Sequence, residues 1–360
     1  MGNKVLMKGN EAVAEAAIRS GCRLYFAYPI TPQSELIEYM AKMMPKVKGT
    51  FLQAESEVSA INMVYGAAGM GKRVMTSSSS PGISLKMEGI SYIAGAELPA
   101  VIVNVQRGGP GLGDIQPAQG DYFQATKGGG HGDYHCITLA PSSVQEFADM
   151  ASDAFDLADK YRIPVMILSD GLLGQMMEPV EFKEYKTEAE MEEMGKQHYE
   201  WCIHNNEAGA GHHHNEINSL EIDPKVLETH VLNLEKKYNH ICENEVKLEE
   251  YHLNDDNEIV CVAFGTAARI VKSAIDDLNA EGRNIGMIRP ITVWPYPYKE
   301  IEKAVHGKVK RVMVFELNLG QMVEDVKLAV NGKVPVDFMG KVGGIVFTPE
   351  EIKEKIKANL

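Results

Sequence analysis

The feature that most constrains the fold is a regular alternation of strand-like and helix-like segments over the first 175 residues. The clearest strand is the apolar run at residues 100–105, which lies between helical patterns at 80–96 and 142–161. Further short strands are expected at residues 23–28, 51–52, 73–76, 136–139 and 163–168, and further helices at 11–18, 32–44 and 57–68. Strands and helices that alternate in this way predict an α/β fold with a parallel sheet covered by helices on both faces.

The alternation stops at residue 181 and resumes at residue 258. The intervening residues 181–257 hold 19 Asp and Glu against 7 Lys and Arg, a net charge of −12 out of −14 for the whole chain. Apolar residues at helical spacing over 224–241 indicate a helix within this stretch. We therefore expect an α/β domain over residues 1–180, an acidic and partly helical linker over 181–257, and a smaller α/β domain over 258–360.

Composition excludes several classes of protein. The acidic balance argues against nucleic-acid binding, because phosphates are held by clustered Lys and Arg. No stretch approaches the roughly 18 to 20 consecutive apolar residues of a membrane helix. The first residues also lack the apolar core of a signal peptide. We therefore expect a cytoplasmic protein that is not inserted in a membrane.

Cysteines and histidines give little indication of a metal site in this chain. No two of the five cysteines lie closer than 19 residues apart, whereas iron–sulfur clusters and structural zinc sites use closely spaced thiolates. Disulfides are equally unexpected in a cytoplasmic protein of this size. The consecutive His212, His213 and His214 could bind a metal, but neighbouring side chains do not share a helix face, and a solvated loop is the favoured interpretation. We expect no metal ligand in this chain.

A glycine-rich segment resembles a phosphate-binding loop without matching it. Residues 66–73 nearly follow the pattern G-x-x-x-x-G-K-[ST], but Arg73 stands where a hydroxyl must bind Mg²⁺. The segment also follows a helix, whereas a phosphate-binding loop follows a strand. A glycine-rich helix end is the better interpretation.

Polar side chains follow four of the expected strands. Thr31 lies after the first strand, two carboxylates (Glu55 and Glu57) after the second, a run of serines at 77–80 after the third, and Arg107 after the clearest one. In open α/β sheets, ligands bind at the carboxyl ends of the strands. The arginine is followed by a long loop, residues 108–132, that contains nine glycines, and long loops inside compact domains are often functional.

Each of these groups also has a structural explanation. Thr31 can cap a helix before Pro32, acidic residues in a first helical turn favour the helix dipole, and an arginine at a strand end is often a surface residue. Their common position is more informative than any one of them. Together they predict a site for a small anionic substrate, where Arg107 can hold a carboxylate, and for a second group that needs a carboxylate from the protein.

At these residues the sequence resembles the α chain of the 2-oxoacid:ferredoxin oxidoreductases over nearly its whole length. The resemblance rests on Tyr28-Pro29-Ile30-Thr31-Pro32, on Glu57 nine residues before Gly66, on the loop 77–82, and on Val105-Gln106-Arg107-Gly108-Gly109-Pro110. It implies a first domain that binds the pyrimidine half of thiamine diphosphate and a second domain of the transketolase C-terminal type. Residues 338–344 are most similar to the branched-chain (2-oxoisovalerate) type, and the 2-oxoglutarate type is close behind.

The resemblance also implies roles for single residues. Glu57 would share a proton with N1′ of the aminopyrimidine, and the spacing to Gly66 favours it over the neighbouring Glu55. Thr31 and Arg107 match positions that hold the substrate carboxylate. Pro29, Ile30 and Ser80 match the surroundings of the pyrimidine. The hard chemistry would belong to the cofactor.

The chain lacks parts that the complete enzyme needs. It has neither a G-D-G motif for the diphosphate and its Mg²⁺ nor the cysteines of a [4Fe–4S] cluster. The resemblance therefore implies a β chain that supplies both, a small ferredoxin-like chain, and ferredoxin as electron acceptor, with a 2-oxoacid and coenzyme A as substrates. Two alternatives are another thiamine-dependent transketolase or carboligase half, and a non-catalytic assembly module with the same scaffold.

Overall fold

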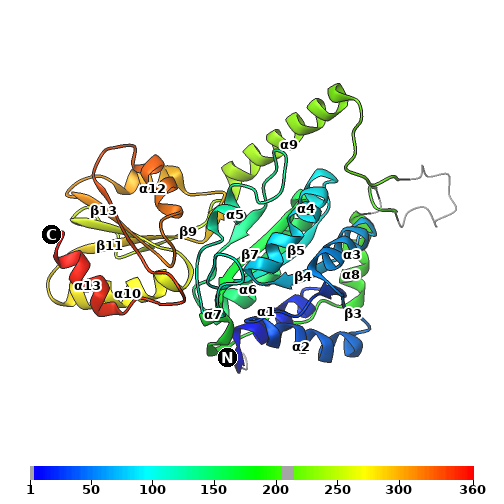
Figure 1. The fold of residues 1–360 in the computed structure, drawn as a ribbon, viewed down its shortest axis with the longest axis horizontal. Coiled ribbons are helices and arrows are strands. Elements are labelled where there is room, and N and C mark those ends of the chain that lie inside the picture. Colours follow the sequence, from blue (N-terminus) through cyan, green and yellow to red (C-terminus); the bar gives the residue numbers. More distant parts are fainter. Residues whose placement is uncertain (1–3, 199, 204–214) are drawn as a thin grey trace.

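The computed structural model describes residues 4–198, 200–203 and 215–360 of the chain. A seven-stranded sheet forms the centre of the first domain (Figure 1). In spatial order its strands are β12 (Thr292–Trp294), β6 (Ile137–Leu139), β7 (Pro164–Asp170), β5 (Ala100–Gln106), β4 (Val74–Ser78), β2 (Leu24–Ala27) and β3 (Thr50–Gln53). All neighbours pair in parallel except β12, which is antiparallel to β6. The predicted parallel α/β architecture is confirmed.

Helices cover both faces of this sheet because buried side chains alternate along each strand. On β5, Val101, Val103 and Val105 join the core beneath one set of helices, whereas Ile102 joins the core on the opposite face. The first set comprises α1 (Gly9–Arg19), α2 (Ser34–Met43) and α6 (Val144–Tyr161), and the second comprises α3 (Glu57–Gly69) and α4 (Ser80–Gly95). A 3₁₀ turn (Met44–Val47) and the short helices α5 (Tyr122–Thr126) and α7 (Gly171–Gln175) complete this part.

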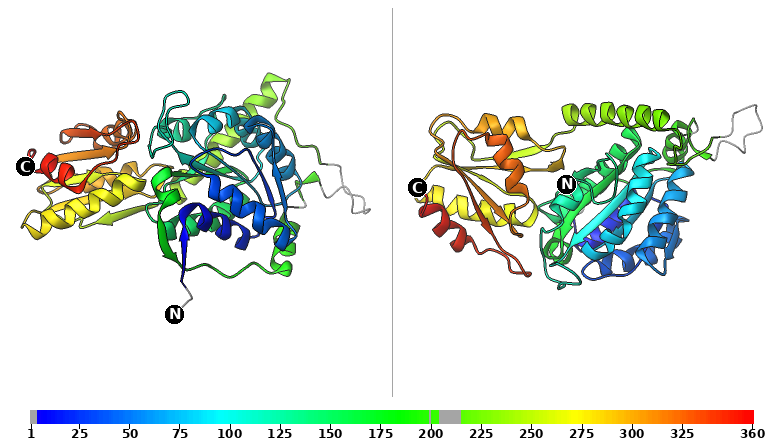
Figure 2. Two further views of the ribbon diagram at one scale, coloured as in Figure 1. Left: turned by 60° about the horizontal axis from the view of Figure 1, so that its bottom comes forward. Right: turned by 45° about the horizontal axis from the view of Figure 1, so that its top comes forward.

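In the described residues of the acidic stretch there are two α-helices. Helix α8 (Glu188–Gln197) has no buried residue, whereas α9 (Pro224–Asn244) buries Leu234, Tyr238 and Ile241 against the core of the first domain. Figure 2 shows α9 lying along one side of the first domain, with its C-terminal end toward the second domain. Just before this stretch, β8 (Met177–Val180) pairs with β1 (Val5–Lys8) in a separate antiparallel ribbon. The histidine tract at 212–214 lies outside the described residues.

The second domain is a five-stranded sheet with strand order β14 (Val336–Gly340), β13 (Arg311–Glu316), β10 (Ile259–Val262), β11 (Ile285–Pro290) and β9 (Leu248–Tyr251). Only β9 runs antiparallel. Its helices are α10 (Gly265–Ala280), α11 (Tyr298–Ala304), α12 (Met322–Val330) and α13 (Pro349–Lys357). The strand pattern did not predict β9 or β12, which are four and three residues long.

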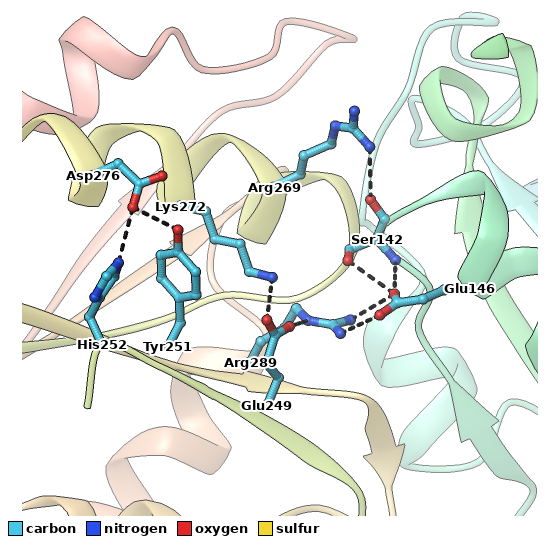
Figure 3. A network of polar contacts seen from close by, with 9 residues as sticks. All are labelled: Ser142, Glu146, Glu249, Tyr251, His252, Arg269, Lys272, Asp276 and Arg289. Carbon is cyan, nitrogen blue, oxygen red and sulfur yellow. Dashed lines mark hydrogen bonds and ion pairs between the residues drawn. The ribbon is translucent and has the colours of Figure 1, made fainter. Parts of the chain in front are cut away.

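The two domains share one apolar core and several charged contacts. A single cluster of buried side chains runs from α3 and α4 to β10, β13 and α12. Nearby, Arg289 of β11 lies between Glu146 of α6 and Glu249 of β9 (Figure 3). Because the core and the ion pairs cross between the domains, their relative position is fixed by packing and by electrostatics.

Among the described residues, none of the helices combines the length and the apolar character that crossing a bilayer requires.

Candidate functional site

The four predicted segments meet at the carboxyl edge of the first sheet. The parallel register of β2, β4 and β5 brings the ends of these strands together, so the residues that follow each strand are neighbours. Buried polar atoms concentrate at this edge. Within the described residues, those without a hydrogen-bond partner include Gln33 Nε2, Ser78 Oγ, Ser79 Oγ, Asn104 Oδ1, Arg107 Nε and Ser169 Oγ. Buried polar groups in proteins are normally paired, so such a concentration indicates a place where a ligand supplies the missing partners.

Glu57 is the first residue of α3 and only 6% of it is exposed. The preceding Ser56 caps the helix by accepting a hydrogen bond from Ser59 N at 3.2 Å. The helix dipole favours negative charge at this position. Glu55, by contrast, is exposed and accepts a hydrogen bond from the Ser59 hydroxyl. Of the two candidate carboxylates, only Glu57 is directed into the protein.

The start of α4 packs against the carboxyl group of Glu57. A Cβ atom at Gly82 would lie 2.6 Å from Glu57 Oε1 and closer still to Ser78 Oγ. Glycine is therefore required here, because any side chain would push the carboxylate and the serine apart. The unpaired hydroxyls of Ser78 and Ser79 adjoin this point. The sequence pattern had marked the serine loop but not the reason for the glycine.

Lys86 is a fully buried cation one helical turn after Gly82. Its ammonium group donates to the hydroxyl of Thr76 and to the carbonyl of Ser77, which are both neutral acceptors. Burial lowers the pKa of Lys86 to about 7, while the negative charge of Glu57 acts in the opposite direction. Sequence reasoning missed this residue, although a lysine between Leu85 and Met87 in an apolar helix was a visible signal.

Arg107 joins two of the predicted segments. Its side chain is buried, and its Nη1 donates to the carbonyl oxygen of Thr31 at 3.0 Å. Nη2 donates to the carbonyl oxygen of Leu112 at 2.9 Å, while Nε has no partner among the described residues. The guanidinium is thus held by neutral oxygens and keeps its full positive charge available for an anion. Thr31 itself is exposed, beside Pro29 and the half-buried Ile30.

Ser80 lies between Arg107 and an acidic residue that sequence reasoning missed. The Ser80 hydroxyl donates to Asp121 Oδ2 at 2.6 Å and accepts from the backbone N–H of Arg107 at 3.0 Å. Asn104 Nδ2 donates to the same carboxylate oxygen at 2.9 Å. Burial raises the pKa of Asp121, and the hydrogen bonds from Ser80 and Asn104 oppose that rise. Asp121 lies in the glycine-rich loop, where no periodic pattern singled it out.

A cavity of about 580 Å³ opens beside these residues. One wall carries Ser80, Arg107 and Asp121 of the first domain, and the other carries Asn318, Leu319 and Gln321 of the second. Its size suits a small substrate. Among the described residues, no group of three or more His, Cys, Asp or Glu side chains is arranged to hold a metal ion.

The first domain is an open α/β domain, a class in which ligands bind at the carboxyl ends of the parallel strands. A buried glutamate and a buried arginine lie at this edge. Residues 15–241 match the family described as pyruvate flavodoxin/ferredoxin oxidoreductase, thiamine diphosphate-binding, and residues 257–352 match pyruvate:ferredoxin oxidoreductase core domain II. The chain therefore belongs to the 2-oxoacid:ferredoxin oxidoreductase family.

Two relatives match over nearly their full length. The chain is 48% identical to the ketoisovalerate oxidoreductase subunit VorB of Methanothermobacter thermautotrophicus, over 98% of this chain and 97% of the relative. It is 37% identical to the 2-oxoglutarate synthase subunit KorA of Methanocaldococcus jannaschii, over 97% and 98% respectively.

Two solved structures share the fold. A 2-oxoglutarate:ferredoxin oxidoreductase from Magnetococcus marinus, with 2-oxoglutarate, coenzyme A and succinyl-CoA bound, superposes with a TM-score of 0.83 at 27% identity. The match covers 99% of this chain and 65% of that one, so this chain spans less than two thirds of it. A split-gene transketolase matches with a TM-score of 0.58 at 12% identity, which shows a transketolase-like fold alone.

Proposed function

We propose that this chain is a subunit of a CoA-acylating 2-oxoacid:ferredoxin oxidoreductase. The reaction converts a 2-oxoacid and coenzyme A into acyl-CoA, CO₂, one proton and two electrons, and the electrons pass to ferredoxin. The observation that carries the proposal is the group of unpaired polar atoms around a buried glutamate and a buried arginine at one sheet edge. Such a site needs both an anionic substrate and a polar cofactor to satisfy its groups.

Thiamine diphosphate fits the residues around Glu57. When bound, it supplies the carbon nucleophile and the electron sink that decarboxylation of a 2-oxoacid requires. Glu57 would hold a proton at N1′ of the aminopyrimidine from its buried position at the start of α3. Gly82 leaves room for that contact, and the unpaired hydroxyls of Ser78 and Ser79 offer further hydrogen bonds. Pro29, Ile30 and Ser80 would border the pyrimidine.

Arg107 would hold the carboxylate of the 2-oxoacid, together with Thr31. The unpaired Nε of Arg107 can donate to a carboxylate oxygen without breaking either existing hydrogen bond of the guanidinium. A charged hydrogen bond in a partly buried site is stronger than one in water. Thr31 follows β2, and its exposed hydroxyl can donate to the same anion.

Partner chains would complete the site. We propose that a β chain supplies the diphosphate site with its Mg²⁺ and a [4Fe–4S] cluster, and that a small ferredoxin-like chain continues the electron path. Large apolar side chains are exposed on the segments that carry the site, namely Tyr28, Val58, Leu85, Leu112 and Leu319. A surface of this kind is typical of a protein interface. Both relatives are themselves named as subunits.

The branched-chain 2-oxoacid 2-oxoisovalerate is the favoured substrate, because the 48%-identical relative is a ketoisovalerate oxidoreductase subunit. The alternative is 2-oxoglutarate, which appears in the names of the 37%-identical relative and of the superposed enzyme. One methylene in an apolar pocket changes binding by only about 1–3 kcal/mol, so substrate choice depends on details of the pocket.

An anaerobic assay of the chain co-expressed with its partner chains tests the proposal. Reduction of a viologen dye is measured with coenzyme A and each of 2-oxoisovalerate, 2-oxoglutarate, pyruvate and an aromatic 2-oxoacid. We expect CoA-dependent reduction, with kcat/KM highest for 2-oxoisovalerate. Highest activity with 2-oxoglutarate would establish the alternative substrate. Absence of dye reduction with every 2-oxoacid would overturn the proposed function.

A further inference from the structure

A short segment of the first domain is hydrogen-bonded to the second domain at both of its ends. We call this segment, residues 119–123, the interdomain clasp. Gln119 exchanges two bonds with Leu317 (Gln119 N to Leu317 O, 2.9 Å, and Leu317 N to Gln119 Oε1, 3.0 Å). Gln119 Nε2 also donates to Phe264 O at 2.8 Å. Asn318 Nδ2 donates to Gln119 O at 2.8 Å.

The other end of the clasp is held in the same way. Gln321 Nε2 donates to Gly120 O and accepts from Phe123 N, both at 2.8 Å. The Tyr122 hydroxyl donates to Asp325 Oδ2 at 2.6 Å. The Tyr122 ring packs on Phe264 with ring centroids 5.6 Å apart, within the apolar core that both domains share. The second domain therefore determines the position of the clasp backbone.

Asp121 lies in the middle of the clasp and faces the first domain. Its backbone N–H donates to Gln106 Oε1 at 3.0 Å, and its side chain accepts from Ser80 and Asn104. Because the Ser80 hydroxyl donates to Asp121, its lone pairs are directed to the backbone N–H of Arg107. The chain of contacts thus runs from the second domain through Asp121 and Ser80 to Arg107.

The loop between Arg107 and the clasp is built around the guanidinium. Arg107 and Pro117 form an isolated antiparallel bridge, and Gly108 N donates to Gln116 O at 3.0 Å. Leu112 at the turn of this loop accepts from Arg107 Nη2. The returning arm of the loop ends at Gln119, so the clasp fixes the loop that orients the arginine.

We propose that Gln119 and Asp121 are positioning residues for Arg107, and that the second domain, through the clasp, sets the affinity of the site for the substrate carboxylate. This rests on the proposed function of Arg107. On this proposal the second domain takes part in substrate binding. Small displacements of a positioned group have large effects on binding and rate, and the clasp is the element that would transmit them.

The test compares Gln119→Ala with Arg269→Ala in the complex with its partner chains. Arg269 belongs to another contact between the domains, where it pairs with Glu178 at 2.7 Å and lies near Ser142 (Figure 3). We expect Q119A to raise KM for the 2-oxoacid about 10-fold with kcat within about twofold, as the loss of one or two hydrogen bonds predicts. R269A is expected to leave both constants unchanged.

Two further variants keep the test decisive. Gln321→Ala loosens the clasp without removing a fully buried side chain, and Asp121→Ala removes the oxygen that accepts from both Ser80 and Asn104. Both should raise KM with the same small effect on kcat. An unchanged KM in Q321A and D121A, or an equal rise in R269A, would overturn the proposal. Activity of the wild-type complex in the same assay shows whether the proposed function itself holds.

Discussion

Lys86 and Arg289 are both fully buried basic residues, but their hydrogen-bond partners differ completely. Arg289, in the contact between the domains, pairs with Glu146 and Glu249, each at 2.6 Å. Lys86, behind the candidate site, donates to a hydroxyl and a carbonyl. The basic side chain between the domains has carboxylate partners within the chain, whereas Lys86 and Arg107 at the sheet edge are held by neutral oxygens. Buried basic groups without a carboxylate partner are candidates for a functional site.

The same contrast holds for the hydrogen bonding of buried polar atoms. At the carboxyl edge of the first sheet, buried polar atoms of Gln33, Ser78 and Arg107 lack partners among the described residues. At the corresponding edge of the second sheet, Glu316 is the last residue of β13 and accepts from Met322 N at 2.8 Å and Val323 N at 2.9 Å. The carboxyl edges of the two sheets thus differ: the first leaves buried polar atoms without partners among the described residues, and the second pairs its buried carboxylate within its own domain.

The largest effect is expected at Glu57. Glu57→Gln removes the group that would exchange a proton with the cofactor, and activity of the complex should fall about 100- to 10,000-fold, the usual range for loss of acid–base catalysis. Dye reduction with 2-oxoisovalerate and coenzyme A measures it. The matched control is Glu55→Gln, because Glu55 is exposed only two residues away and should be dispensable. Near-normal activity in E57Q, or equal losses in both variants, would contradict the role of Glu57.

The interdomain cluster should affect stability and leave substrate affinity alone. Arg289→Met leaves the carboxylates of Glu146 and Glu249 without their shared partner (Figure 3). We expect the free energy of unfolding to fall by about 3 kcal/mol, as is usual when one member of a buried ion pair is removed. KM for the 2-oxoacid should stay within about twofold. Chemical denaturation of the full chain and steady-state kinetics of the complex separate the two readouts. A large rise in KM without loss of stability would contradict the structural role of Arg289 and place it in substrate binding.

Substitution of Arg107, unlike that of Arg289, should affect the kinetics of the 2-oxoacid. Arg107→Ala removes the proposed partner of the substrate carboxylate, so kcat/KM for the 2-oxoacid should fall about 10- to 100-fold, the range for a lost hydrogen bond to a charged group. Arg107→Lys keeps the charge but not the planar guanidinium, so its kcat/KM should lie between those of the wild type and R107A. Kinetics with varied 2-oxoacid at saturating coenzyme A measure this. An unchanged kcat/KM in R107A would favour a non-catalytic role for the chain.

Sequence patterns were sufficient to predict the features that depend on residues close together in the sequence. The alternation of strands and helices predicted the parallel sheet, because apolar strands and amphipathic helices are recognisable over a few residues. The position of polar residues after strands brought Thr31, Glu57, Ser80 and Arg107 together, because parallel strands end at the same edge.

The missed features depend on contacts that are distant in sequence. Gln119 bonds to Leu317, 198 residues away, and no local pattern connects them. Asp121 lies in a loop where glycines hide any periodicity. Strand β12 has only three residues, and it lies within the sequence of the second domain although it pairs with the first sheet. Lys86 is different, since a lone lysine in an apolar helix is a signal that the sequence itself carries.

Lys86 gives the smallest effect per pH unit and the sharpest test of the contrast with Arg289. Its pKa of about 7 in the folded chain lies below the ordinary value of 10.5, so between pH 7 and 10.5 the unfolded chain holds a proton at this lysine that the folded chain lacks. The unfolded state then binds more protons, and stability rises with pH. Lys86→Met removes this dependence while keeping the apolar stem. The wild type should therefore gain up to about 1.4 kcal/mol per pH unit relative to K86M across this window. Denaturation of both full chains at pH 7, 8, 9 and 10 measures the difference. Parallel stability curves would mean that Lys86 keeps its proton in the folded chain and is neutralised there, as Arg289 is.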